Sequence, residues 1–230
     1  MQQTVTDATA IGASRVFAEL LERHKIREHP EIKQQTFAPG ETIFRKGDPG
    51  DSLYVIQNGQ VKIVLPSDGE DEALLGVLEA GDFFGELSLI DGQVRSASAV
   101  AAEPTQALVL HRDQFLEFVH ASPEFALDVM VALAQRLRQS DEVIADAAFL
   151  DVAGRLAKRL VDLAARYGRP SPDGTVISLR LTQRELAGMI GATRESVNKH
   201  LQSLRAQRII TADGGRIVIR DLEKLRRRIY

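Results

Sequence analysis

A glycine, a glutamate, an arginine and a serine near the middle of the chain have the chemistry of a site for a small anion. Gly85 and Glu86 open what reads as a short helical turn, and Arg95 and Ser96 follow about ten positions later. Free backbone N–H groups at a helix start bind anions, and an arginine fork closes on phosphate oxygens in a bidentate way. A glutamate accepts hydrogen bonds from a sugar hydroxyl. Together these residue types predict a site for an anionic sugar phosphate, and therefore a ligand sensor.

The segment that surrounds these residues, 32–111, has the pattern of an antiparallel β structure. Turn signals recur at close intervals, at Pro39-Gly40, Asp48-Pro49-Gly50, Asn58-Gly59, Asp68-Gly69 and Ala80-Gly81. Short apolar or alternating runs lie between them, at 53–56, 61–65, 74–78 and 107–110. This spacing is typical of a sandwich or barrel. A short amphipathic helix is predicted before it, over residues 10–27.

A long helix is predicted to follow, over residues 122–150. Ser122, Pro123 and Glu124 form a helix start, and no breaker occurs before Leu150. One seam of the helix repeats at spacings of three and four: Met130, Leu133, Leu137, Ser140, Ile144 and Ala147. Such a stripe favours a coiled-coil homodimer, the alternative being a helix packed on its own barrel. The polar Ser140, followed by Asp141, either specifies the register or meets a polar ligand.

The C-terminal part has the pattern of a winged helix-turn-helix. After a helix from Asp151 to about residue 167 and a loop over 168–174, a strand-like run over 176–181 leads to the capping box of Thr182 and Glu185. A tight turn at residues 191–192 separates this helix from a second one, capped by Thr193. Residues 209–219, with Asp213-Gly214-Gly215 in the middle, read as a β-hairpin wing.

The second of these helices carries polar side chains at its start, where recognition helices contact base edges. Arg194 can bind guanine O6 and N7, Glu195 can accept from cytosine N4, and Lys199 can reach a second guanine or a phosphate. Thr182 and Arg216 are candidates for phosphate contacts. The DNA-binding residues that we predict are Thr182, Thr193, Arg194, Glu195, Ser196, Asn198, Lys199 and Arg216.

The charge distribution agrees with a polyanion partner for this end. Residues 1–150 hold 12 Lys and Arg against 24 Asp and Glu, a net charge of −12, whereas residues 151–230 hold 17 against 8, a net charge of +9. The chain has no cysteine, which excludes disulfides, thiolate metal sites and cysteine nucleophiles. No apolar run is long enough for a membrane span and no secretory signal is recognisable, so we expect a cytoplasmic protein without a membrane partner.

Three groups of motifs, taken together, are similar to those of a known family. They are Phe84-Gly85-Glu86-Leu87 with Arg95-Ser96-Ala97, Phe149-Leu150-Asp151-Val152, and Thr193-Arg194-Glu195-Ser196-Val197. In these the chain resembles the catabolite activator/fumarate-nitrate regulator (CRP/FNR) family of bacterial transcription factors, over about residues 37–219 and most closely its cyclic-AMP-receptor branch. The missing cysteines disfavour the iron–sulfur branch, and the five histidines form no ligand cluster that would indicate haem.

The resemblance implies a role for each residue of the anion site. Arg95 and Ser96 would bind the cyclic phosphate, and Glu86 the ribose 2′-hydroxyl, with Ser140 and Asp141 of the partner subunit at the purine. The predicted ligand-binding residues are Ile63, Leu75, Gly85, Glu86, Leu87, Ser88, Arg95, Ser96, Ser140 and Asp141. Asp141 stands where a second small hydroxyl residue is usual, and an aspartate can accept from the adenine amino group or from guanine N1–H and N2–H.

The DNA-reading residues also depart from the family in one place. Lys199 stands where a second arginine is common, so the TGTGA-like half-site that the resemblance implies would have a weaker contact there. By analogy, the loop over residues 167–174 is a candidate contact for RNA polymerase.

The predicted architecture is α+β. It comprises an N-terminal antiparallel β-roll or jelly roll over residues 1–121, a long dimerisation helix over 122–150 and a winged helix-turn-helix over 151–230. The predicted function is a cyclic-nucleotide-dependent transcription regulator with cyclic AMP (cAMP) as its effector, a homodimer that binds a palindromic operator. The alternatives are cyclic GMP (cGMP), cyclic di-GMP or another effector, and a ligand-independent DNA-binding protein. An enzyme is not expected, because the barrel has only His111 near its end and no cluster of metal ligands.

Overall fold

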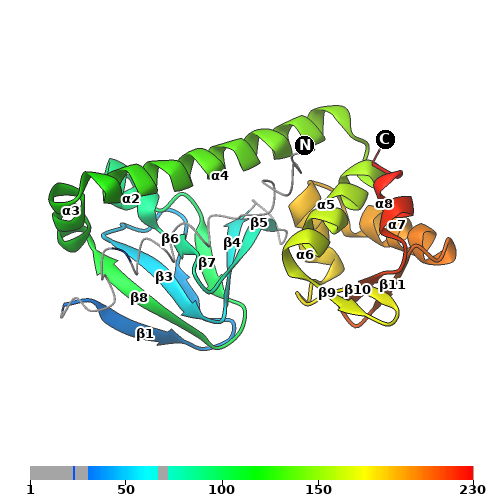
Figure 1. Cartoon of the computed structure of the whole chain (residues 1–230), viewed down its shortest axis with the longest axis horizontal. Coiled ribbons are helices and arrows are strands. Elements are labelled where there is room, and N and C mark those ends of the chain that lie inside the picture. Colours follow the sequence, from blue (N-terminus) through cyan, green and yellow to red (C-terminus); the bar gives the residue numbers. More distant parts are fainter. Residues whose placement is uncertain (1–22, 24–30, 67–71, 230) are drawn as a thin grey trace, which may run out of the picture. The chain divides into compact units, whose positions relative to one another are not determined.

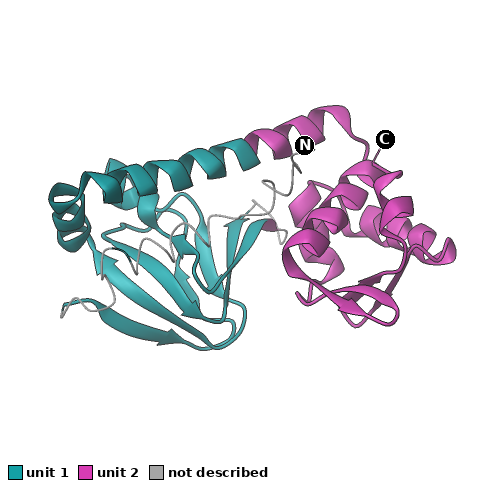
Figure 2. Cartoon of the chain, in the orientation of Figure 1, with its two compact units in different colours: residues 1–66, 75–139 teal, residues 67–74, 140–230 magenta. Residues whose placement is uncertain are grey.

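The computed structural model describes Arg23 and residues 31–66 and 72–229, and it divides into two compact units. Residues 1–66 and 75–139 form one unit, and residues 67–74 and 140–230 form the other (Figures 1 and 2). The predicted helix over residues 10–27 lies outside the described residues, apart from Arg23. None of the described helices is long and apolar enough to cross a membrane.

The first unit is built on two four-stranded sheets, as the spacing of turns and apolar runs predicted. The strands are β1 (Lys33–Phe37), β2 (Thr42–Phe44), β3 (Ser52–Asn58), β4 (Gln60–Pro66), β5 (Glu72–Glu79), β6 (Phe83–Phe84), β7 (Ser98–Ala101) and β8 (Thr105–His111). Their orders are β1-β8-β3-β6 and β2-β7-β4-β5, with antiparallel pairing in β1–β8, β3–β8 and β4–β7. Leu53, Phe83 and Leu110, all fully buried, belong to the core of this β-roll.

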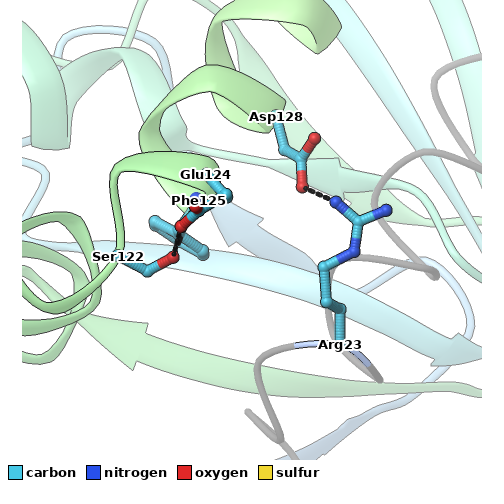
Figure 3. Close-up of polar contacts among 5 residues, drawn as sticks. All are labelled: Arg23, Ser122, Glu124, Phe125 and Asp128. Carbon is cyan, nitrogen blue, oxygen red and sulfur yellow. Dashed lines mark hydrogen bonds and ion pairs between the residues drawn. The ribbon is translucent and has the colours of Figure 1, made fainter.

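Three described helices accompany the roll: α2 (Glu86–Asp91), α3 (Arg112–Ala121) and α4 (Pro123–Phe149). The long helix begins where the sequence predicted, because Ser122 Oγ accepts from the Phe125 backbone N–H at 3.3 Å and donates to Glu124 at 2.9 Å (Figure 3). In the same region Arg23 forms an ion pair with Asp128 at 3.0 Å (Figure 3). The N-terminal half of α4 buries Phe125, Val129 and Ala132 against the roll.

The second unit is a winged helix-turn-helix. Its elements are α5 (Val152–Tyr167), β9 (Gly168–Ser171), β10 (Gly174–Ile177), α6 (Gln183–Ile190), α7 (Arg194–Ala206), β11 (Ile210–Asp213), β12 (Arg216–Ile219) and α8 (Leu222–Arg226). The strands form one sheet in the order β11-β12-β10-β9. The wing is the predicted hairpin, since Asp213 pairs with Arg216 across Gly214 and Gly215, both of which have positive φ.

Two predictions in this unit need correction. The segment over residues 168–174 is not a loop but a hairpin, in which Pro170 of β9 pairs with Thr175 of β10. A proline without an N–H is tolerated there because β9 is the edge strand of the sheet. The strand-like run after it ends at Ile177 rather than at residue 181. The sequence analysis also missed α8, which Asp221 caps by accepting from the Lys224 backbone N–H at 2.9 Å.

Candidate functional site

The predicted anion site is built on a glycine that no other residue replaces without strain. Gly85 lies between β6 and α2 with φ +84°, in the left-handed region, and caps the start of α2. A Cβ atom on Gly85 would lie 2.7 Å from Nη1 of Arg95 and 3.1 Å from the carbonyl oxygen of Ser52. The local sequence therefore allows the arginine to close directly on the backbone of this turn.

Arg95 is the charged centre of the site. Its side chain is nearly buried, at 4% exposure, and Nη1 donates to the Gly85 carbonyl at 2.7 Å. The guanidinium carbon lies 4.2 Å from the centroid of the Phe44 ring. Burial lowers the pKa of the Arg95 guanidinium, against the opposing effects of Tyr54 and nearby carboxylates. Nε of Arg95 is buried and has no hydrogen-bond partner in residues 31–66 and 72–229 or at Arg23, so this donor is available to an acceptor from outside these residues.

Glu86, also buried, is held by a residue that the sequence analysis missed. Nη1 of Arg136, on α4, lies 2.7 Å from Oε1 of Glu86, while Nη2 donates to the Phe83 carbonyl and the guanidinium carbon lies 4.2 Å from the centroid of the Phe83 ring. Arg136 lies one helical turn before Ser140 and three residues after Leu133, which packs against the core of the roll. This spacing places Arg136 near the roll, but the sequence does not show that it meets Glu86. The structure therefore joins the Glu86 turn to α4.

The remaining predicted ligand residues divide into packed and exposed positions. Ser88 is buried beside Arg95, and a Cβ atom on Gly50 would lie 2.7 Å from Oγ of Ser88 and from Nε of Arg95. Ile63 packs against the cluster that contains Phe84. The exposed positions are Leu75, Leu87, Ser96, Ser140 and Asp141. The structure thus gathers Gly85, Glu86, Ser88 and Arg95 into one compact group, packs Ile63 in the roll, and leaves the other five predicted contacts exposed.

The predicted dimer seam is mostly exposed on the single chain. Met130, Leu137 and Ile144 are more than half exposed, and Ser140 and Ala147 are also exposed. Leu133 differs, because it packs against the core of the β-roll. The N-terminal half of α4 therefore packs on its own roll, and most of the predicted seam is exposed on the single chain.

The DNA-reading end has the geometry that the capping signals predicted. Thr182 and Glu185 form a capping box at the start of α6, and Thr193 Oγ1 accepts from the Ser196 backbone N–H at 3.2 Å at the start of α7. Val197, Leu201 and Leu204 bury one face of α7. Arg194, Glu195, Lys199 and the wing residue Arg216 are exposed, and Ser196 and Asn198 are half-buried. The hydroxyl of Thr182 also donates to Glu185 at 2.9 Å, so it is engaged within the helix start.

The described residues contain no group of three or more His, Asp or Glu side chains that could hold a metal ion. A β-roll with a buried glutamate paired to an arginine and with a further, buried arginine, followed by a long helix and a winged helix-turn-helix, defines the class of ligand-responsive transcription regulators.

Comparisons with known proteins place the chain within that class. The family model described as a cyclic nucleotide-binding domain matches residues 34–122, and that of a Crp-like helix-turn-helix domain matches residues 154–228. The chain is 37% identical over 198 residues, 86% of its length and 88% of the relative, to a CRP-like cAMP-activated global transcriptional regulator of Mycobacterium tuberculosis H37Rv. It is 32% identical over 180 residues, 77% of its length and 85% of the relative, to the cAMP-activated global transcriptional regulator CRP of Escherichia coli O157:H7.

Solved structures agree with this placement. The c-di-GMP-responsive regulator CLP of Xanthomonas campestris matches with a TM-score of 0.77 and 26% identity, over 86% of this chain and 98% of that one. A CRP/FNR-family regulator of Thermus thermophilus matches with a TM-score of 0.73 and 27% identity, over 86% and 98%. The chain belongs to the CRP/FNR family, and it is a cyclic nucleotide-binding, DNA-binding transcription regulator. This confirms the family and fold class predicted from the sequence, and the family consists of transcription regulators rather than enzymes.

Proposed function

We propose that this chain is a homodimeric regulator that binds cAMP in its β-roll and, once loaded, binds a palindromic DNA operator. The observation that carries the proposal is Arg95, whose buried Nε has no acceptor among the described residues and whose Nη1 donates to the carbonyl of Gly85, the neighbour of the buried Glu86. A cyclic phosphate supplies the missing acceptor, and a ribose 2′-hydroxyl donates to Glu86. In the proposal Ser96, the exposed residue that follows Arg95, donates a second hydrogen bond to the phosphate.

The purine contacts decide which cyclic nucleotide is bound. In the proposal Ile63 and Leu75 line the apolar side of the ligand, and Ser140 with Asp141 of the partner subunit meets the base. The relatives from M. tuberculosis and E. coli are both named as cAMP-activated, which supports cAMP. Asp141 keeps cGMP open as a second candidate, and the X. campestris neighbour, described as responsive to c-di-GMP, keeps cyclic di-GMP open.

The proposed dimer is supported by the exposed seam of α4. Met130, Leu137 and Ile144 recur at a seven-residue interval and are exposed on the single chain, which is the pattern that a second copy of the same helix covers. Two winged helices related by a two-fold axis bind two half-sites about 34 Å apart on DNA. The nucleotide then acts by binding the DNA-competent arrangement more tightly than the other. RNA polymerase is the proposed partner of the bound dimer, with the β9–β10 hairpin as its candidate contact.

The test is calorimetric titration of the purified protein with cAMP, and in parallel with cGMP and cyclic di-GMP. Binding of cAMP at one site per subunit, lost in Arg95→Ala, supports the proposal. A preference for cGMP or cyclic di-GMP keeps the mechanism and changes the signal. If none of the three nucleotides binds, the sensor proposal fails and only the proposal of DNA binding by the winged helix-turn-helix remains.

DNA binding is tested separately, by titrating a TGTGA-like palindromic duplex with and without nucleotide. Stimulation by cAMP that disappears in Arg95→Ala supports the coupling of the two sites. Stimulation that persists in Arg95→Ala at the same nucleotide concentration contradicts it.

A further inference from the structure

The two helices of the helix-turn-helix are joined by one hydrogen bond between side-chain amides. Nε2 of Gln183, the first residue of α6, donates to Oδ1 of Asn198, in the second turn of α7, at 3.2 Å. Asn198 follows Arg194 by four residues, so the two side chains lie on the same side of the helix. Gln183 and Asn198 both line a groove of about 240 Å³ between α6, α7 and the β11–β12 wing.

The direction of this hydrogen bond fixes the orientation of the Asn198 amide. A side-chain amide has an acceptor oxygen and an NH₂ donor, and here the oxygen is turned toward Gln183, which turns the NH₂ group away from it. Within the part of the chain that the structure describes, Nδ2 of Asn198 has no protein partner. Its two N–H donors are therefore the groups left for a base edge beside the one read by Arg194.

We propose that Gln183 is a positioning residue for base recognition: it holds the Asn198 amide so that α7 presents donors, and not an acceptor, at this position. The inference rests on the proposed function, because it requires that α7 reads DNA. A freely turning asparagine pairs with both N6 and N7 of adenine. An asparagine whose oxygen is held inside the protein instead favours the acceptor oxygens of guanine O6 and thymine O4. It discriminates against the amino groups of adenine N6 and cytosine N4.

A purely structural interpretation of the same bond is that it only ties α6 to α7. The variant Gln183→Glu separates the two interpretations, because a carboxylate accepts hydrogen bonds and cannot donate one. In this variant the new carboxylate accepts a hydrogen bond from Nδ2 of Asn198. The Asn198 amide is then turned around and presents Oδ1 to the groove. An acidic residue in the first turn of α6 is also favourable there, so this variant is expected to fold.

The experiment measures base preference in the full-length, nucleotide-loaded protein. Each position of the half-site is varied to all four bases, and relative affinities are measured by competition for the wild type, Asn198→Ala, Gln183→Ala and Gln183→Glu. We expect one position to favour guanine or thymine by about three- to tenfold, the effect of one hydrogen bond. Asn198→Ala removes this preference, Gln183→Ala makes adenine as good as guanine, and Gln183→Glu inverts the preference toward adenine or cytosine.

Ratios of affinity within each variant cancel the general weakening that a new negative charge near DNA causes. The double variant Gln183→Glu/Asn198→Ala tests whether the inversion passes through Asn198, since Arg205 also lines the groove and is a second possible partner for a glutamate at 183. The inversion must vanish in the double variant. An inversion that survives in it overturns the inference, as does a Gln183→Glu protein that binds every duplex more weakly with unchanged ratios. A wild-type protein that binds no duplex sequence-specifically refutes the proposed function itself.

Discussion

Arg136 makes three contacts with the predicted anion site, and its removal gives the most direct test of how that site is held. We consider Arg136→Met, which keeps most of the length and the apolar stem of the side chain. The variant loses the 2.7 Å ion pair with Glu86, the hydrogen bond to the Phe83 carbonyl and the contact over the Phe83 ring. It leaves Glu86, whose side chain is 4% exposed, as an unpaired buried carboxylate.

Breaking a buried ion pair by removing one partner costs about 3–5 kcal/mol. The Arg136 side chain is 27% exposed, so we place the loss at the low end, about 3 kcal/mol in the free energy of unfolding. The cost comes mainly from the charge left behind. Adding Glu86→Gln to Arg136→Met is therefore expected to recover about 1–2 kcal/mol, since a neutral amide is less costly to leave buried.

The assay is urea unfolding of the ligand-free protein, followed by circular dichroism. It is applied to Arg136→Met, to Glu86→Gln and to the double variant that carries both changes. Arg138→Met is the matched control, because it removes the same charge from an exposed position two residues along the same helix. The reasoning is refuted if Arg136→Met costs no more than Arg138→Met. It is equally refuted if the effects of Arg136→Met and Glu86→Gln add in the double variant, because contacting residues should show a coupling energy well above about 0.5 kcal/mol.

Three further predictions follow from single contacts. Arg194→Ala should lose about 1–3 kcal/mol of DNA-binding free energy at the specific operator and relax the base preference at one base pair, as measured by competition between duplexes. Uniform weakening on all sequences would show that Arg194 contacts a phosphate instead. Asp151→Ala should cost about 1 kcal/mol of unfolding free energy, because Oδ1 of Asp151 accepts from the Gly154 N–H at 2.7 Å at the start of α5, whereas Asp151→Asn should cost little. Burial raises the pKa of the Tyr54 phenol, so the folded protein holds this proton more tightly than the unfolded chain. The contribution of Tyr54 to the free energy of unfolding is constant below the ordinary pKa of about 10, and it is lost as the pH rises through the pKa of the folded state. Tyr54→Phe should therefore flatten the alkaline decrease in stability, and an unchanged slope would exclude Tyr54 as its source.

Local signals in the sequence predicted most of the fold. The Ser122, Thr182 and Thr193 caps each bond to a backbone N–H three residues later, which is a short-range property that a sequence pattern contains. The turn at Gly85 was predictable for the same reason. The β9–β10 hairpin was missed because Pro170 argues against a strand unless its place at a sheet edge is known, and edge position is a property of the assembled sheet.

The candidate site was predicted as a set of residue types but not as a network. Glu86 and Arg95 lie in one local motif, so the sequence pattern was enough to single them out. Arg136 lies 50 positions from Glu86, and the charged face of a helix gives no sign of which arginine meets a buried carboxylate. The hydrogen bond between Gln183 and Asn198 was missed for a related reason, because the packing angle of two helices decides it.

In the proposed mechanism, Arg136 is the residue that connects the nucleotide site to α4. Its guanidinium bonds to Glu86, while the next residue, Leu137, is exposed on the uncovered seam. A ribose hydroxyl that bonds to Glu86 joins the same carboxylate as Arg136, so its binding would change the charge and geometry that this arginine of α4 meets. A 10- to 100-fold stimulation of DNA binding requires about 1.4–2.8 kcal/mol of coupling free energy. The Glu86–Arg136 interaction is expected to contribute about 3 kcal/mol to the unfolding free energy, so a difference in only part of it between the two DNA-binding states would supply this coupling. Arg136→Met should then retain DNA binding but lose most of its stimulation by nucleotide. Full stimulation of DNA binding in Arg136→Met would show that the coupling passes through another contact of α4.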